Sequence, residues 1–343
     1  MGFTIIDTIV FCLYCTVIVA IGLWVSQDEE GHQKDAEDYF LAGKSLPWWA
    51  IGASLIAANI SAEQIIGMSG SGFAVGLAIA SYEWMAAVTL IVVGKYLLPI
   101  FIEKEIFTIP EFVEKRFNTT LKTILAVFWI ALFVFVNLTT VLYLGALALD
   151  TIMGTGDGSL MIYALIGLAS IAAAYSLYGG LSAVAWTDVI QVGLLVLGGF
   201  VVTFAGLYNL TPDGGIINGI THLYEVAGDK FQMILDRSNP EYKNLPGIAV
   251  LIGGMWGGQS LTYWGFNQYI IQRTLAAKSL EESQKGIIFA GFLKLIIPLI
   301  VVIPGIIVYV LFNQPEGTTR CQVLWMSLRS RMAVFSTIMP TPG

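Results

Sequence analysis

Charged residues are scarce in this sequence. Asp, Glu, Lys and Arg make up only 12% of the 343 residues, whereas 56% are hydrophobic. Soluble domains carry charges at about a quarter of their positions, so the composition predicts an integral membrane protein. The net charge is −7 and no basic patch is present, which argues against nucleic acid as a partner.

Cysteine and histidine are also rare. Cys12, Cys15 and Cys321 follow no metal-binding or disulfide spacing. The two histidines, His32 and His222, fall in predicted loops, and neither an HExxH nor a GxSxG motif is present. These absences disfavour an intramembrane enzyme, so we expect a protein that is not an enzyme.

Long apolar runs, by contrast, fill most of the chain. A membrane-spanning helix needs about 20 apolar residues, and about eight such segments are visible. They cover residues 4–25, 47–73, 78–102, 121–149, 159–177, 186–208, 247–272 and 286–312. The first has neither the basic residues nor the cleavage site of a signal peptide, so it is predicted to span the membrane. We therefore expect an all-α polytopic membrane protein.

The loops between these segments alternate between two sides of the membrane. Most basic residues lie on the side formed by residues 26–46, 103–120, 178–185 and 273–285. They are Lys34, Lys44, Lys104, Lys115, Arg116, Arg273, Lys278 and Lys285. The positive-inside rule makes this side cytoplasmic and places the N-terminus outside. Residues 313–343 hold no membrane-length apolar segment, and we expect either a disordered tail or a shifted reading frame there.

The apolar segment 47–73 carries four polar side chains at its centre, namely Asn59, Ser61, Glu63 and Gln64. Polar groups at this depth are costly unless they face a cavity or a partner. Transporters place substrate and coupling ion at interrupted membrane helices of this kind. The alternative is a helix-packing face built on Gly72 and Gly76, which explains the glycines but explains Glu63 and Gln64 poorly.

Further polar side chains are predicted at membrane depth. Lys294 lies about half a bilayer into its segment, so its ammonium needs a partner or a water-filled cavity, and we favour a cavity role. Lys95 lies near the end of its segment and is expected to snorkel without a specific function. Glu83 lies early in the third segment. Asn137 either bonds to another helix or contacts a ligand, and the sequence leaves both open.

The segment 247–272 resembles 47–73, because it also combines glycines with polar side chains inside an apolar stretch. Two glycine pairs, 253–254 and 257–258, precede Gln259, Ser260, Tyr263 and Trp264. Glycine pairs mark places where a helix breaks, and aromatic rings beside polar side chains suit a sugar. An aromatic belt at the membrane interface is the alternative. Two interrupted segments separated by four ordinary ones predict an inverted repeat of five helices.

Three stretches resemble the sodium/solute symporter family, most closely its bacterial sodium/galactose (sodium/glucose) cotransporters: YFLAGKSLPWWAIGASLIAANISAEQ, YSLYGGLSAVAWTDVIQ and YWGFNQYIIQRTLAAK. The resemblance covers about residues 1–312 and implies a LeuT-like inverted-repeat fold. An extra helix 4–25 would precede a first repeat 47–208 and a partial second repeat 247–312, because the family continues for several more helices. The tail 313–343 does not resemble the family.

The resemblance also implies site residues. Those implied to contact the sugar are Gln64, Met68, Tyr82, Glu83, Asn137, Ser260, Tyr263, Trp264 and Lys294. The backbone carbonyls of Ala57 and Ile60 are implied to hold sodium, and Asp188 to lie on its exit path. Ser260 stands where the galactose cotransporters have Asn, so the sugar is left open.

These expectations describe a sodium-coupled symporter for a hexose such as galactose or glucose, working by alternating access in a bacterial plasma (inner) membrane. Its partners would be a small sugar and the lipid bilayer, and a homo-oligomer is left open. The alternatives are a truncated, transport-inactive fragment, a symporter for another small polar solute, and a substrate-sensing module of the same fold.

Overall fold

The computed structural model describes residues 4–25, 35–153, 158–211, 213–243, 245, 247–248 and 251–313. These residues are helical, with no strand among them beyond an isolated bridge between Leu46 and Ala277. Apart from Asn313, the predicted tail lies outside the described residues. The elements are α1 (Ile5–Val25), α2 (Ala36–Leu41), η1 (Ala42–Lys44), α3 (Trp48–Asn59), α4 (Ala62–Ala74), η2 (Leu77–Ala80), α5 (Ser81–Val92), η3 (Val93–Leu97), α6 (Leu98–Glu103), α7 (Ile109–Arg116), α8 (Thr119–Leu132), η4 (Phe133–Leu138), α9 (Thr139–Ile152), α10 (Met161–Asn209), α11 (Ile216–Ala227), η5 (Gly228–Phe231), η6 (Pro240–Lys243), η7 (Leu251–Ser260), α13 (Leu261–Phe266), α14 (Gln268–Leu275) and α15 (Leu280–Asn313).

Most of the predicted membrane segments are helices of membrane length. Within the described ranges, five helical stretches are long and apolar enough to cross a bilayer: Ile5–Val25, Leu77–Glu103, Thr119–Ile152, Gly179–Asn209 and Leu280–Asn313. Helices α3 and α4 together form a further span that bends by 67° at its break. The expected all-α polytopic architecture and the interruption of segment 47–73 are both confirmed.

The predicted connection at residues 178–185 is a tight turn. Helix α10 consists of two helices that meet at Gly180, where φ is 59° and ψ is −150°. The cytoplasmic assignment of this turn stays a prediction. A Cβ atom on Gly180 would lie 2.4 Å from the carbonyl oxygen of Tyr39, so only glycine fits. Leu181, Ala183 and Ala185 are buried, so this turn packs inside the protein instead of extending into water.

The break in segment 247–272 lies later than the glycine pairs suggest. Both pairs lie in η7, a stretch of wide π-helical turns, and the chain leaves helical geometry at Asn267, between α13 and α14. The glycine pairs therefore widen the helix, and the interruption that was expected at them occurs at Asn267.

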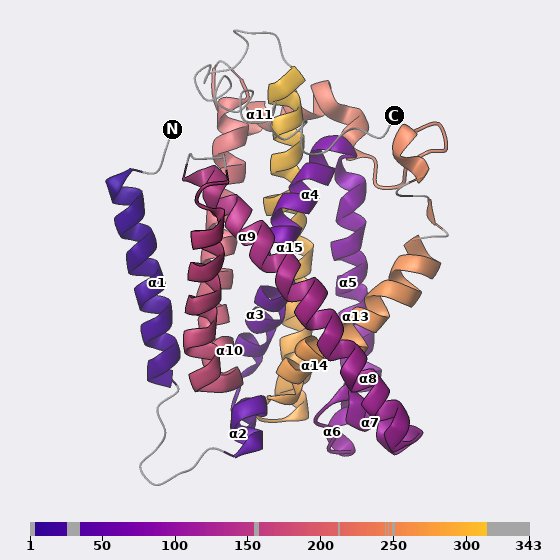
Figure 1. Cartoon of the computed structure of the whole chain (residues 1–343). Helices are drawn as coiled ribbons and strands as arrows, with labels where there is room; N and C mark the ends of the chain where they lie inside the picture. The colour runs from indigo at the N-terminus through magenta and orange to yellow at the C-terminus, as the bar shows by residue number, and fades with distance from the viewer. Residues whose placement is uncertain are drawn as a thin grey trace.

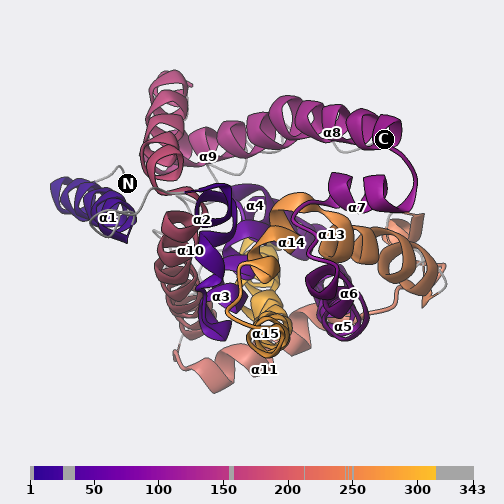
Figure 2. The same ribbon diagram turned by 90° about the horizontal axis from the view of Figure 1, so that it is seen from below.

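Helix α15 lies at the centre of the bundle and packs against α3, α4, α5 and α10, whereas α1 lies at the periphery against α10 (Figures 1 and 2). Glycines let these helices approach closely. A Cβ atom on Gly305 of α15 would lie 2.1 Å from the carbonyl oxygen of Ser69 on α4, and one on Gly72 would lie 2.6 Å from that of Val302. Of the predicted packing pair, Gly72 faces α15, whereas Gly76 lies beyond the end of α4, where a Cβ atom would meet the carbonyl oxygen of Lys230.

We expect Gly305→Ala to lower the thermal unfolding temperature of the purified protein. The added methyl group meets a backbone oxygen, so α4 and α15 must separate, and overpacking of this kind costs about 1–3 kcal/mol. Gly70→Ala on α4 is the matched control, because a Cβ atom there meets nothing within 4 Å. Equal unfolding temperatures for the two variants would contradict this packing.

The two ends of the bundle carry the loops that the sequence groups together. Helices α2, α6 and α7 lie at one end and α11 at the other (Figure 1). At the first end, the backbone N–H of Leu46 donates to the carbonyl of Ala276 over 3.1 Å. At the other end, the Lys230 ammonium donates to the carbonyl of Ala74 over 2.5 Å. This grouping agrees with the predicted alternation of the loops, while the cytoplasmic assignment of the first end stays a prediction.

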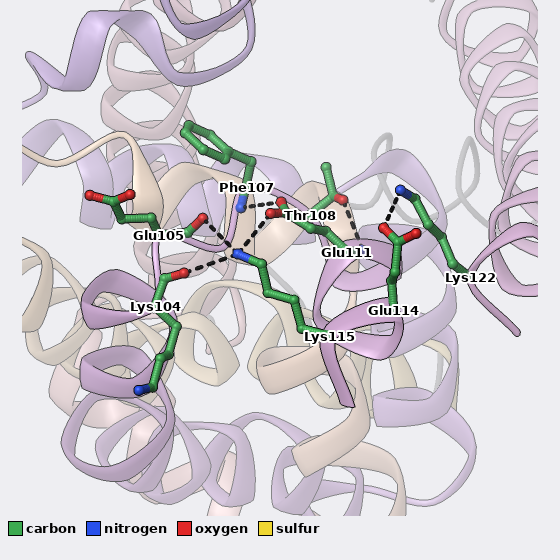
Figure 3. A network of polar contacts seen from close by, with 8 residues as sticks. All are labelled: Lys104, Glu105, Phe107, Thr108, Glu111, Glu114, Lys115 and Lys122. Atoms are coloured by element: carbon green, nitrogen blue, oxygen red, sulfur yellow. Dashed lines mark hydrogen bonds and ion pairs between the residues drawn. The ribbon is translucent and has the colours of Figure 1, made fainter. Parts of the chain in front are cut away.

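A polar network ties the loop that joins α6 to α8 (Figure 3). The Lys115 ammonium pairs with Glu111 at 2.9 Å and donates to the carbonyl of Lys104 at 3.1 Å. Lys122 of α8 pairs with Glu114 of α7 at 2.5 Å, and this hydrogen bond lowers the pKa of the Glu114 carboxyl. The network fixes α7 between two membrane-spanning stretches.

Candidate functional site

The site is built around the break between α3 and α4. Helix α3 ends at Asn59, and both Ile60 and Ser61 have extended backbone before α4 begins at Ala62. A helix end leaves backbone carbonyls without helical partners. Among the described residues, neither the carbonyl of Ala57 nor that of Ile60 accepts a backbone hydrogen bond. These are the carbonyls that the resemblance assigns to sodium, and the break leaves both available to a cation.

A cavity of about 920 Å³ lies beside this break. All of the residues predicted to contact sugar line it, and they come from five stretches of the chain that are far apart in sequence. These residues are Gln64, Met68, Tyr82, Glu83, Asn137, Ser260, Tyr263, Trp264 and Lys294. A cavity of this size falls in the range typical of small-molecule sites, about 300–1,000 Å³.

The predicted partner of Lys294 is a carboxylate. The Lys294 ammonium lies 2.6 Å from Glu83 Oε2, and the two side chains are 1% and 5% exposed. Gln64 donates from its amide nitrogen to the other carboxylate oxygen of Glu83, and Lys294 also donates to the side-chain oxygen of Asn59. In this polar row of Gln64, Glu83, Lys294 and Asn59, the buried charges of Glu83 and Lys294 compensate each other.

The row continues into the aromatic wall of the cavity. The Asn59 amide donates to the Tyr263 hydroxyl over 3.1 Å, and that hydroxyl lies 2.7 Å from the hydroxyl of Tyr269. Trp264 meets Tyr263 edge-on, with ring centroids 5.2 Å apart, and is 3% exposed. Because Trp264 is buried and Tyr263 faces the cavity, an aromatic belt at the membrane interface does not explain this pair.

Asn137 lies in the cavity wall, within the π-helical turns of η4. It makes no hydrogen bond with another described residue, which favours a ligand contact over an interhelical bond. Ser260 lies where η7 passes into α13 and is also part of the wall.

Several cavity residues were not among the predicted sugar contacts. The sequence singled out Asn59, Ser61, Glu63 and Gln259 as polar residues of the interrupted segments but gave them no role in binding, whereas Ser71 and Tyr269 were not predicted at all. No sequence signal placed Tyr269 in the wall, because its position depends on the turn at Asn267.

Asp188 does not line this cavity. It lies between α3, α10 and α14, where its Oδ2 accepts from the Ser54 hydroxyl over 2.5 Å and lies 3.4 Å from the Arg273 guanidinium. Arg273 also donates to Ser54 over 2.8 Å. Arg273 was expected among the loop residues, yet it is only 9% exposed. The predicted place of Asp188 on a sodium path stays a prediction.

Comparison with known proteins agrees with this geometry. The model of the sodium:solute symporter family matches residues 39–337. The chain is 65% identical over 315 residues to a sodium/glucose cotransporter of Vibrio parahaemolyticus, and this match covers 92% of the chain and 57% of that protein. It is 32% identical over 330 residues to sodium/glucose cotransporter 1 of Ovis aries, covering 91% of the chain and 48% of that protein.

A solved structure of a Na+-coupled sialic acid symporter, in a substrate-bound outward-open state, superposes with a TM-score of 0.79 at 22% identity, covering 99% of this chain and 67% of that one. This likeness confirms the expected LeuT-like fold. The curated relatives above are transporters, in agreement with the expectation that the chain is not an enzyme. The chain spans about half the length of these relatives. By the extent of the family match and by this fold, the chain belongs to the sodium:solute symporter family.

Proposed function

We propose that this chain is a sodium-coupled symporter for a hexose such as galactose or glucose, in a bacterial plasma membrane with its N-terminus outside. The observation that carries the proposal is the cavity wall, in which the hydrogen-bonded residues Gln64, Glu83 and Lys294 connect through Asn59 to the Tyr263 ring. Hydroxyl groups of a sugar exchange hydrogen bonds with such a row, while the C–H face of its ring packs on an aromatic side chain.

Each predicted residue has a chemical role in this proposal. The Gln64 amide donates to and accepts from sugar hydroxyls, the Glu83 carboxylate accepts from them, and Lys294 holds that carboxylate in place. The rings of Tyr263 and Trp264 form the apolar, aromatic part of the cavity wall. The remaining predicted contacts come from Met68, Tyr82, Asn137 and Ser260, which complete the wall.

Sodium would bind at the carbonyls of Ala57 and Ile60. Interrupted membrane helices supply carbonyl oxygens to coupling ions in this way, and the break at Ile60 and Ser61 frees both groups. No cluster of His, Cys, Asp or Glu within the described ranges offers a different metal site. Bound sodium supplies a positive charge at the end of α3 that holds the break open beside Asn59.

Sodium and sugar would be coupled through one conformational equilibrium. Sodium binding favours the outward-open form and so raises the affinity for sugar, and both leave after the bundle rocks to face the cytoplasm. The membrane potential drives the cycle with about 2.3 kcal/mol per elementary charge per 100 mV.

A symporter for another small polar solute is the second candidate. Ser260 stands in the cavity wall where the resemblance to galactose cotransporters expects Asn, and its shorter side chain changes which solute group finds a partner there. Competition by other polyols and sugars against labelled galactose separates the two candidates.

The test is sodium-dependent binding of labelled galactose to the purified chain. We expect binding in NaCl but not in choline chloride, and we expect Gln64→Ala to weaken it by about tenfold, because removing one partner of a buried hydrogen bond costs about 1–3 kcal/mol. Gln272→Ala is the matched control, because Gln272 donates to the carbonyl of Phe40 outside the cavity. Galactose binding that ignores sodium, or an unchanged affinity of Gln64→Ala, would contradict the proposal.

A further inference from the structure

One acidic side chain in the cavity wall, Glu63, has no hydrogen-bond or ion-pair partner among the described residues. Glu63 lies in the first turn of α4, lines the cavity and is exposed. It forms no hydrogen bond or ion pair with another described residue. Glu83 differs in every respect, because it is 4% exposed and both of its carboxylate oxygens are occupied, by Lys294 and by Gln64. The two glutamates of the cavity therefore have different tasks.

Glu63 lies in the first turn of α4, at the positive end of the helix dipole, where acidic side chains are favoured. Tyr269 and Tyr263 line the same cavity. The Glu63 carboxylate thus places a negative charge in a cavity that also has an aromatic wall.

No other residue of the described cavity lining balances this charge. The other charged residues in the wall are Glu83 and Lys294, which neutralise each other at 2.6 Å. Arg273 lies behind Tyr269, where it pairs with Asp188, and it does not line the cavity. The described lining therefore carries a net charge of −1, all of it from Glu63.

We propose that Glu63 determines the charge of the solute that the cavity accepts. The site takes neutral hexoses and hexoses that carry a protonated amino group, and it rejects hexoses that carry a carboxylate. This inference rests on the proposed sugar-binding function and deepens it. The physical basis is Coulomb's law, since one unpaired charge within several ångströms of another, near a protein surface, changes affinity by about tenfold or more.

Competition binding tests the proposal without any variant. Labelled galactose is bound to the purified chain in NaCl and displaced with unlabelled galactose, galactosamine or galacturonate. We expect galactosamine to compete at least as well as galactose, and galacturonate to compete at least about tenfold more weakly. Equal competition by galactosamine and galacturonate would overturn the proposal.

Two variants assign the effect to Glu63. Glu63→Gln keeps the size of the side chain and removes the charge, so the preference for galactose over galacturonate should fall by about tenfold. Glu63→Asp keeps the charge and should retain the discrimination of the wild type. If Glu63→Gln still rejects galacturonate, Glu63 does not select solutes by charge, and the proposed sugar site is unaffected. If the wild type binds no galactose at all, both the proposed function and the proposed role of Glu63 are wrong.

Discussion

We expect Lys294→Ala to abolish sodium-dependent galactose binding and uptake without preventing insertion into the membrane. Lys294 is almost fully buried in the middle of α15 and holds Glu83 at 2.6 Å. Breaking a buried ion pair by removing one partner costs about 3–5 kcal/mol, because the other charge is left uncompensated. The Glu83 carboxylate would lose the partner that positions it, and its contacts with Gln64 and with the sugar would weaken.

Two controls separate this loss from misfolding. Lys95→Ala removes a lysine whose side chain is exposed, so binding and insertion should both be normal. Glu83→Gln/Lys294→Met removes both charges at once and should recover much of the stability lost by Lys294→Ala. The double variant should still bind galactose poorly. Galactose binding is measured for each variant together with its detergent-solubilised yield and its size-exclusion profile. Normal galactose binding by Lys294→Ala would remove Lys294 from the site.

Much of this site was predictable because polar groups are rare in membrane segments. Gln64, Glu83 and Lys294 stand out against their apolar neighbours, and a polar group at that depth needs a partner or a cavity. The structure satisfies both requirements, since the three side chains bond to one another and all line the same cavity. The kink at Ile60 and Ser61 was predictable for the same reason.

The parts that were missed depend on backbone geometry that composition does not encode. The connection at 178–185 was predicted, but its apolar residues carry no polar signal that shows a single tight turn at Gly180. The glycine pairs of segment 247–272 indicate that the helix changes there, but not whether it widens or breaks. The position of Tyr269 in the cavity wall follows from the break at Asn267, so it was missed with that break.

The burial of Arg273 was missed for a related reason. A basic residue near the end of an apolar segment was expected to reach the loop, in line with the positive-inside rule. Its pairing with Asp188 could not be predicted from the sequence, because 85 residues separate the two.

The division of the chain into two inverted repeats, 47–208 and 247–312, stays a prediction.

The second large effect is expected at Asp188, where three elements meet. Asp188→Ala should lower the unfolding temperature sharply, because it leaves the Arg273 guanidinium buried without a counter-charge, at a cost of about 3–5 kcal/mol. Arg273→Ala should be similar in size, and the double variant should lose less than the sum of the two, since both changes remove one interaction.

The matched control is the exposed pair of Glu281 and Lys285, 2.7 Å apart on the first turns of α15. Glu281→Ala should change stability by less than about 1 kcal/mol, because exposed ion pairs contribute little. Strictly additive losses for Asp188→Ala and Arg273→Ala would contradict the pairing.

The proposed place of Asp188 on a sodium path is tested by measuring the sodium concentration that gives half-maximal galactose binding. Asp188→Asn keeps the shape of the side chain and removes its charge, so this concentration should rise if sodium passes Asp188. If it stays unchanged in a folded variant, the Ser54–Asp188–Arg273 cluster holds α3, α10 and α14 together and has no part in the ion path.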